Sequence, residues 1–106
     1  MADDPQTPPQ QQINIELSED IAEGIYSNLV MIAHSPEEFI LDFIRVVPGV
    51  PKARVKSRVI VTPQHAKRLL RALDENIKRY ERAHGAVDER VGPGQTIQFG
   101  SGMGEA

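Results

Sequence analysis

The sequence predicts an α+β fold, in which a four-stranded antiparallel sheet, a meander or a related strand order, is followed by one long C-terminal helix packed on it. Two patterns support this class. Several short segments alternate apolar and polar residues, as half-buried strands do, and a single apolar stripe of helical period follows them. Both ends of the 106-residue chain lack such patterns, so we expect one domain over residues 13–85, flanked by disordered tails.

The two predicted tails differ from the domain in composition. Residues 1–12 are rich in Pro and Gln and offer little to bury, so we expect them to be disordered. Residues 86–106 are rich in Gly and polar residues, which predicts a flexible tail. Within it, Thr96-Ile97-Gln98-Phe99 alternates briefly, a weak pattern that is compatible with an extra edge strand.

Two strands are predicted before the first proline of the domain. Ile13, Ile15 and Leu17 alternate with polar residues in segment 13–18, which predicts a half-buried strand. The second strand lies in residues 24–34, where the run 29–33 is apolar without interruption. Such a run indicates a strand that is covered on both faces, by a helix on one side and by a second copy of the chain on the other.

Residues 38–47 fit both a helix and a strand. The preceding Ser35-Pro36-Glu37-Glu38 resembles a capping box with proline at the first helical position, and it would start a helix with one apolar stripe. The β-branched and aromatic content of the segment instead favours a strand. The short Pro-Gly-Val-Pro connection to the next alternating segment supports the strand as well. We therefore predict a strand over residues 38–47.

The fourth predicted strand, residues 52–62, leads directly into the helix. Its alternation places Arg54, Lys56 and Arg58 on one face. Thr62 is a suitable N-cap, Pro63 a suitable first residue and Gly85 a suitable C-terminal cap. The apolar stripe of the helix consists of Ala66, Leu69, Leu70, Leu73, Ile77 and Tyr80. One helix covers only one face of the sheet, so we expect a homo-oligomer, either a dimer or a dimer of dimers.

Composition excludes several classes of function. The chain has no cysteine, which excludes disulfides, thiol catalysis and thiolate metal sites. The net charge is −3, but residues 13–85 carry 11 Lys or Arg against 10 Asp or Glu, a nearly neutral body that is not typical of a dedicated nucleic-acid binder. The acidic, polar start resembles no signal peptide and no apolar run would span a membrane, so we expect a cytoplasmic protein without membrane association.

Motifs for catalysis or metal binding are missing from the sequence. His34, His65 and His84 are far apart and do not follow a metal-ligand spacing. Neither Ser27 nor Ser57 lies in a nucleophile motif, and the C-terminal glycines precede no phosphate-loop lysine. We therefore expect no enzyme activity, no cofactor and no metal.

Two groups of residues are candidates for binding. One group could contact an anion or an acidic partner, unless neighbouring carboxylates such as Glu16, Glu38 and Asp42 neutralise it: Arg45, Lys52, Arg54, Lys56 and Arg58. We call these five residues the basic group. Tyr26 and Asn28, next to Gly24 in the second predicted strand, are candidates for a subunit interface, with a ligand or peptide contact as the alternative.

The segments GIYSN, SPEEFILDF and PGVPKARVKSRVIVTPQHAKRLL resemble a bacterial and archaeal family that is known only as domain of unknown function 3467. This resemblance covers about residues 13–85 and implies no activity and no site residues. The order of strands followed by a helix also resembles the SecB export chaperone, at the level of architecture only.

The expected function is that of a small homo-oligomeric binding protein. A protein-interaction or chaperone-like adaptor is the first hypothesis. A nucleic-acid-associated accessory protein that uses the face of Arg54, Lys56 and Arg58 is the alternative, and a small enzyme with an unrecognised site is the second alternative.

Overall fold

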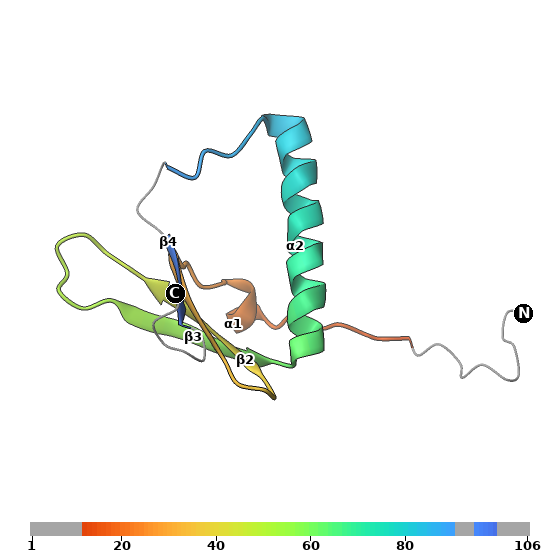
Figure 1. The fold of residues 1–106 in the computed structure, drawn as a ribbon, viewed down its shortest axis with the longest axis horizontal. Coiled ribbons are helices and arrows are strands. Elements are labelled where there is room, and N and C mark those ends of the chain that lie inside the picture. Colours follow the sequence, from red (N-terminus) through yellow and green to blue (C-terminus); the bar gives the residue numbers. More distant parts are fainter. Residues whose placement is uncertain (1–11, 91–94, 100–106) are drawn as a thin grey trace, which may run out of the picture.

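The fold is seen in a computed structural model, which describes residues 12–90 and the backbone of residues 95–99 (Figure 1). The elements follow one another as α1 (Glu19–Ala22), β1 (Leu29–His34), β2 (Phe39–Arg45), β3 (Arg54–Val61), α2 (Pro63–His84) and β4 (Gln95–Phe99). The predicted α+β class with an antiparallel sheet before a C-terminal helix is confirmed. Most of the predicted N-terminal tail, residues 1–11, lies outside the described residues.

Three of the predicted strands form the antiparallel part of the sheet. The strand order is β3-β2-β1-β4; β2 is antiparallel to both β1 and β3, whereas β4 runs parallel to β1. β4 contains the alternating segment 96–99 noted in the sequence. The predicted strand at 13–18 is wrong, because these residues are extended but unpaired and lead into α1. Alternation alone cannot form a strand unless a neighbouring backbone is there to pair with.

The hairpin between β1 and β2 decides the ambiguous segment 38–47 in favour of a strand. The N–H of Ser35 donates to the carbonyl of Glu38 at 2.9 Å. The Oγ of Ser35 accepts from the N–H groups of Glu37 and Glu38 at 3.2 and 3.3 Å. The serine that could cap a helix thus closes a turn instead, and β2 forms as predicted. His34 and Phe39, partners in the register, stack with ring centroids 5.2 Å apart.

A β-bulge interrupts the pairing of β2 with β3. Phe43 pairs with Ser57, but the next residue, Ile44, pairs with Val55, so Lys56 is the extra residue. A bulge of this kind shifts the alternation of the strand by one residue. The prediction that Arg54, Lys56 and Arg58 share one face is therefore wrong, because the alternation changes on the N-terminal side of Ser57.

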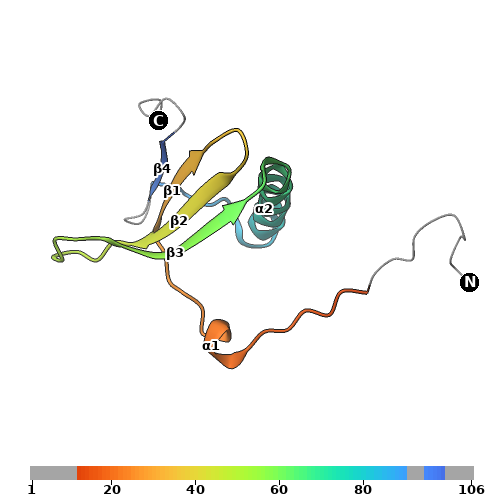
Figure 2. The ribbon, with the colours of Figure 1, turned by 90° about the horizontal axis from the view of Figure 1, so that it is seen from below.

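α2 has the predicted ends but not the predicted packing. Thr62 Oγ1 accepts from the N–H of His65 at 3.1 Å, and Gly85, at a φ of 93°, ends the helix with its N–H on the carbonyl of Glu81 at 2.8 Å. No residue of α2 is buried, and Leu70 and Leu73 are 66% and 54% exposed. Only Thr62 separates β3 from α2, and the helix leaves the sheet at this turn instead of lying along it (Figures 1 and 2).

The buried core of one chain is very small. Within residues 12–90, Ile44 at 5% and Asp42 at 8% exposure are the only residues classed as buried. Figures 1 and 2 show α1 and α2 on the same side of the sheet. Neither described helix is long and apolar enough to cross a lipid bilayer. The amphipathic helix α2 and the outer strand β3 nevertheless leave much apolar surface in contact with water.

Candidate functional site

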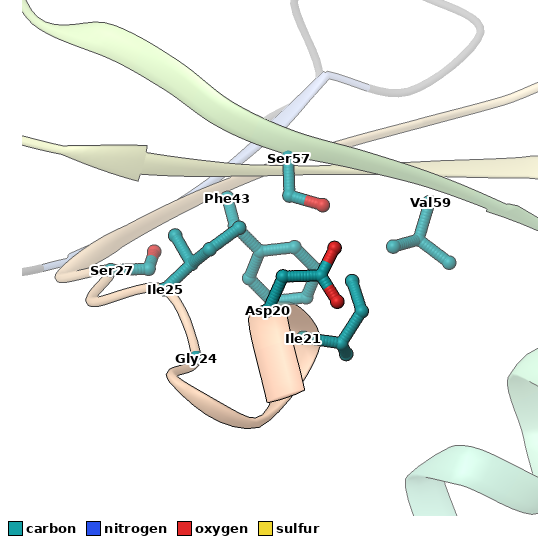
Figure 3. A pocket seen from close by; sticks show the side chains of 8 residues that line it. All are labelled: Asp20, Ile21, Gly24, Ile25, Ser27, Phe43, Ser57 and Val59. Carbon is teal, nitrogen blue, oxygen red and sulfur yellow. The ribbon is translucent and has the colours of Figure 1, made fainter. Parts of the chain in front are cut away.

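An apolar cavity of about 410 Å³ lies between α1 and the sheet (Figure 3). α1 and the segment that follows it form one wall, and β2 and β3 form the other. Its lining consists of Asp20, Ile21, Gly24, Ile25, Ser27, Phe43, Ser57 and Val59. Most of the wall is contributed by four apolar side chains, so the cavity is suited to an apolar group.

Local hydrogen bonds hold α1 under the sheet. Gly24 has a φ of 77°, which is unfavourable for other residues, and its N–H donates to the carbonyl of Ile21 at 3.0 Å. This turn directs the chain from α1 towards β1. Ser27 then fixes the chain on the sheet, because its Oγ lies 3.0 Å from the carbonyl oxygen of Ile44 and 3.1 Å from that of Leu29.

The polar groups of the cavity are hydrogen-bonding groups rather than a catalytic set. The hydroxyl of Ser18 donates to Asp20 Oδ1 at 2.7 Å and, as the main cause, lowers the pKa of the Asp20 carboxyl. No hydrogen bond among the described residues joins Ser27 or Ser57 to a histidine. The site therefore offers the carboxylate of Asp20 and the hydroxyl of Ser57 beside apolar walls. Within the described part of the chain, neither serine is activated as a nucleophile by a histidine.

The opposite face of the sheet carries an ion pair between Asp42 and Arg58. Phe43 and Ser57 line the cavity, so their neighbours Asp42 and Arg58, which pair across the strands, point to the other face. Arg58 donates from Nε to Oδ1 at 2.7 Å and from Nη2 to Oδ2 at 2.8 Å. These bonds lower the pKa of the Asp42 carboxyl, against the opposing effect of its burial. Arg58 is thus already engaged with a carboxylate.

The rest of the basic group is dispersed by the bulge. Arg54 pairs with Arg45, which lies three positions from Asp42 along β2 and therefore points to the opposite face from the Asp42–Arg58 pair. The guanidinium of Arg45 lies 5.7 Å from the centroid of the Tyr26 ring. Lys52 belongs to the β2–β3 connection, and Lys56 is exposed at the bulge. Of the three carboxylates predicted to neutralise the group, Asp42 alone forms an ion pair within residues 12–90.

Asn28 has a structural role next to β1. Its Nδ2 donates to the carbonyl of Val46 at 3.0 Å, and its Oδ1 accepts from the N–H of Val46 at 2.8 Å. The amide thereby extends the pairing between β1 and β2 by imitating a backbone partner. Tyr26 is exposed, with Arg45 over its ring. The predicted interface role of these two residues stays a prediction.

Sequence reasoning missed the cavity. The only signal for it was local: Ile21 and Ile25 lie four residues apart, on either side of a glycine, in a segment that was divided between a predicted strand and a connection. Within the described part of the chain, no three His, Asp or Glu residues are grouped so that they could hold a metal ion.

The Asp42–Arg58 pair predicts a pH dependence of stability. The folded pKa of Asp42 lies below its ordinary value of 3.8, so its contribution to stability is fully present above that value and is lost as the pH falls through the folded pKa. We expect the thermal midpoint of the wild type to fall between about pH 5 and about pH 2 more steeply than that of Asp42→Asn. Thermal unfolding followed by circular dichroism measures both slopes.

The matched control for this prediction is Asp74→Asn. Asp74 forms an exposed ion pair with Lys78 at 3.0 Å, and exposed pairs contribute little to stability. Its pH profile is expected to follow that of the wild type. Identical slopes for Asp42→Asn and the wild type would contradict the role given to the Asp42–Arg58 pair.

Comparison with known proteins identifies the family. The model of a protein family of unknown function (DUF3467) matches residues 1–89, and the chain belongs to this family. No curated protein matches the chain. No solved structure matches it either, and the architectural resemblance to SecB stays a prediction.

Proposed function

We propose that this member of the DUF3467 family is a small cytoplasmic homo-oligomeric protein that binds other proteins, as an interaction or chaperone-like adaptor, and does not catalyse a reaction. The observation that carries this proposal is the contrast between a minimal core and extensive apolar exposure. Ile44 is the one buried apolar residue in the described part of the chain, while many large apolar side chains are exposed. Exposed apolar surface on this scale is typical of interaction surfaces.

Self-assembly is the first part of the proposal. Five large aliphatic or aromatic residues of the α2 stripe are more than two-fifths exposed, among them Leu73 and Tyr80, and β3 exposes Val55, Val59 and Ile60 as well. Burying apolar surface stabilises by about 25 cal/mol per Å². A second copy of the chain offers surfaces of the same kind, and a dimer or a dimer of dimers would bury both. A stable interface covers about 800 Å² on each partner.

Protein binding is the second part, and the cavity supports it. Cavities for small ligands measure about 300–1,000 Å³, so one of about 410 Å³ can receive an apolar anchor side chain. Interfaces concentrate their binding free energy in such anchors. The carboxylate of Asp20 and the hydroxyl of Ser57, at the cavity wall, can bind backbone N–H groups of the partner polypeptide.

Selection from a displayed library of random peptides tests this part. Peptides that bind the wild type are expected to share a large apolar residue. Ile21→Asp places a charge at the cavity wall, and we expect it to weaken binding of the selected peptides at least about tenfold, because the anchor would have to desolvate that charge. Fluorescence anisotropy of a labelled selected peptide measures the affinity.

Val87→Asp is the matched control for Ile21→Asp. Val87 is half exposed and lies after α2, away from the residues that line the cavity, so this variant is expected to bind like the wild type. Unchanged affinity in Ile21→Asp, with the variant still folded by circular dichroism, would exclude the cavity as the peptide site.

The alternative of a nucleic-acid accessory protein has less support. Arg58 is engaged with Asp42, and Arg54 points to the opposite face of the sheet, so the cations of β3 do not form one array. Single-stranded nucleic acid also needs aromatic side chains on which bases stack. Tyr26 is the exposed aromatic nearest to the basic group, and its ring already faces Arg45.

A further inference from the structure

The segment 13–18, which we call the N-terminal arm, has the pattern of a strand but pairs with no strand among the residues that the structure describes. It runs extended from residue 12 to Ser18, before α1, and Figure 1 shows it leading away from the sheet. Ile13, Ile15 and Leu17 are 78%, 88% and 69% exposed. An alternating segment of this kind gains stability only when its apolar side is covered and its backbone is paired.

β3 provides a free edge that matches the arm. It is an outer strand of the sheet, and no described residue forms a backbone hydrogen bond to its outer side. The bulge at Lys56 interrupts the N-terminal half of this edge and leaves residues 57–61 as its regular part. That regular part is about as long as the arm. An unpaired edge is a template for a strand from another chain.

We propose that the N-terminal arm of one copy pairs, as an additional strand, with the outer edge of β3 in a second copy. The second copy returns its own arm in the same way, because a two-fold interface repeats each contact. This inference rests on the self-assembly proposed above and specifies the segment that joins the copies. An arm that stays in its own chain would have to turn back from Ser18, where the chain enters α1.

Side-chain chemistry fixes which side of the arm faces the cavity. Val59 and Val61 lie on the face of β3 that lines the cavity. Val59 is exposed there, as are the aliphatic side chains of the arm. Placing Ile13, Ile15 and Leu17 on this face turns Glu16 to the opposite face, where Arg58 lies. The side chain of Arg58 is still 59% exposed, and a guanidinium has five N–H donors, of which Asp42 uses two. Apolar contact and charge therefore agree on one orientation.

Disulfide trapping tests this arrangement, and the cysteine-free chain needs no background substitutions. Two differently tagged chains are co-expressed, one with Val59→Cys and the other with Ile13→Cys, Ile15→Cys or Leu17→Cys. After mild oxidation, a non-reducing gel separates covalent heterodimers from single chains. We expect at least one of the three arm variants to form the heterodimer, at a level about tenfold above that of Asn14→Cys, because a disulfide needs Cβ atoms within about 4.5 Å of each other.

Asn14→Cys is the matched control, since it lies on the other side of the same arm. Val61→Cys, on the same face as Val59, repeats the test if Val59→Cys does not fold.

Equal trapping by Asn14→Cys and Ile15→Cys would overturn the orientation. A disulfide within one chain, seen for Ile15→Cys/Val59→Cys together, would overturn exchange between copies. If the wild type sediments as an oligomer but no variant forms a disulfide between chains, the placement of the arm is overturned and the proposed self-assembly stands. If the wild type sediments as a monomer, the proposed function is contradicted as well.

Discussion

Replacing Leu73 by glutamate is expected to leave the protein monomeric and to abolish its cooperative unfolding. Leu73 lies at the centre of the α2 stripe and is 54% exposed in the single chain. Burial of a leucine side chain stabilises by about 1.5–3 kcal/mol, and a symmetric dimer contains the residue twice. Glutamate removes this contribution and would in addition bury a charge in the interface.

Sedimentation equilibrium and thermal unfolding measure the effect of Leu73→Glu. Arg71→Glu is the matched control, because it introduces the same side chain on the charged side of the same helix. We expect Arg71→Glu to keep the mass and the cooperative transition of the wild type. A Leu73→Glu protein that keeps the oligomeric mass would show that the α2 stripe is not the assembly surface.

Ile44→Ala is expected to lower the free energy of unfolding by about 2–5 kcal/mol. Ile44 is the buried apolar residue of β2, the middle one of the three antiparallel strands, and it pairs with Leu29 on β1 and with Val55 on β3. Its carbonyl also accepts the N–H of Asn28 at 3.0 Å, so the residue joins the strands by backbone and side chain together. Truncation to alanine leaves a cavity in a core that has little else to fill it.

Urea unfolding of Ile44→Ala measures this loss as a shift in the midpoint at constant slope. Val50→Ala is the control, because Val50 is half exposed in the β2–β3 connection and its truncation removes little buried surface. We expect a change within about 0.5 kcal/mol for that variant. Equal losses in the two variants would contradict the role of Ile44 as the buried residue of the core.

The elements that the sequence predicts well are those fixed by local interactions. α2 begins and ends where Thr62, Pro63 and Gly85 indicate, because caps act within a few residues of the chain. β1, β2 and β3 form where β-branched and aromatic residues are concentrated. β2 forms within residues 38–47, as the sequence predicts, because the hairpin turn at Ser35 leads into a strand and not into a helix.

The features that the sequence does not predict depend on what lies opposite a residue. Alternation in the N-terminal arm indicates a strand, but no strand among the described residues pairs with it. The bulge at Lys56 depends on the register between two strands and separates cations that alternate in sequence. The cavity depends on how Gly24 turns the chain under the sheet, and the position of α2 depends on the single residue that joins it to β3.

The central claim is that one chain is an incomplete fold and that a second copy completes it. The most direct test is the thermal midpoint of the wild type over a hundredfold range of protein concentration, with the mass at each concentration from sedimentation equilibrium. Because association stabilises the folded state by mass action, we expect an oligomeric mass and a midpoint that rises with concentration. A cooperative transition at a concentration-independent midpoint, with the monomer mass of 11.8 kDa throughout, would contradict the claim.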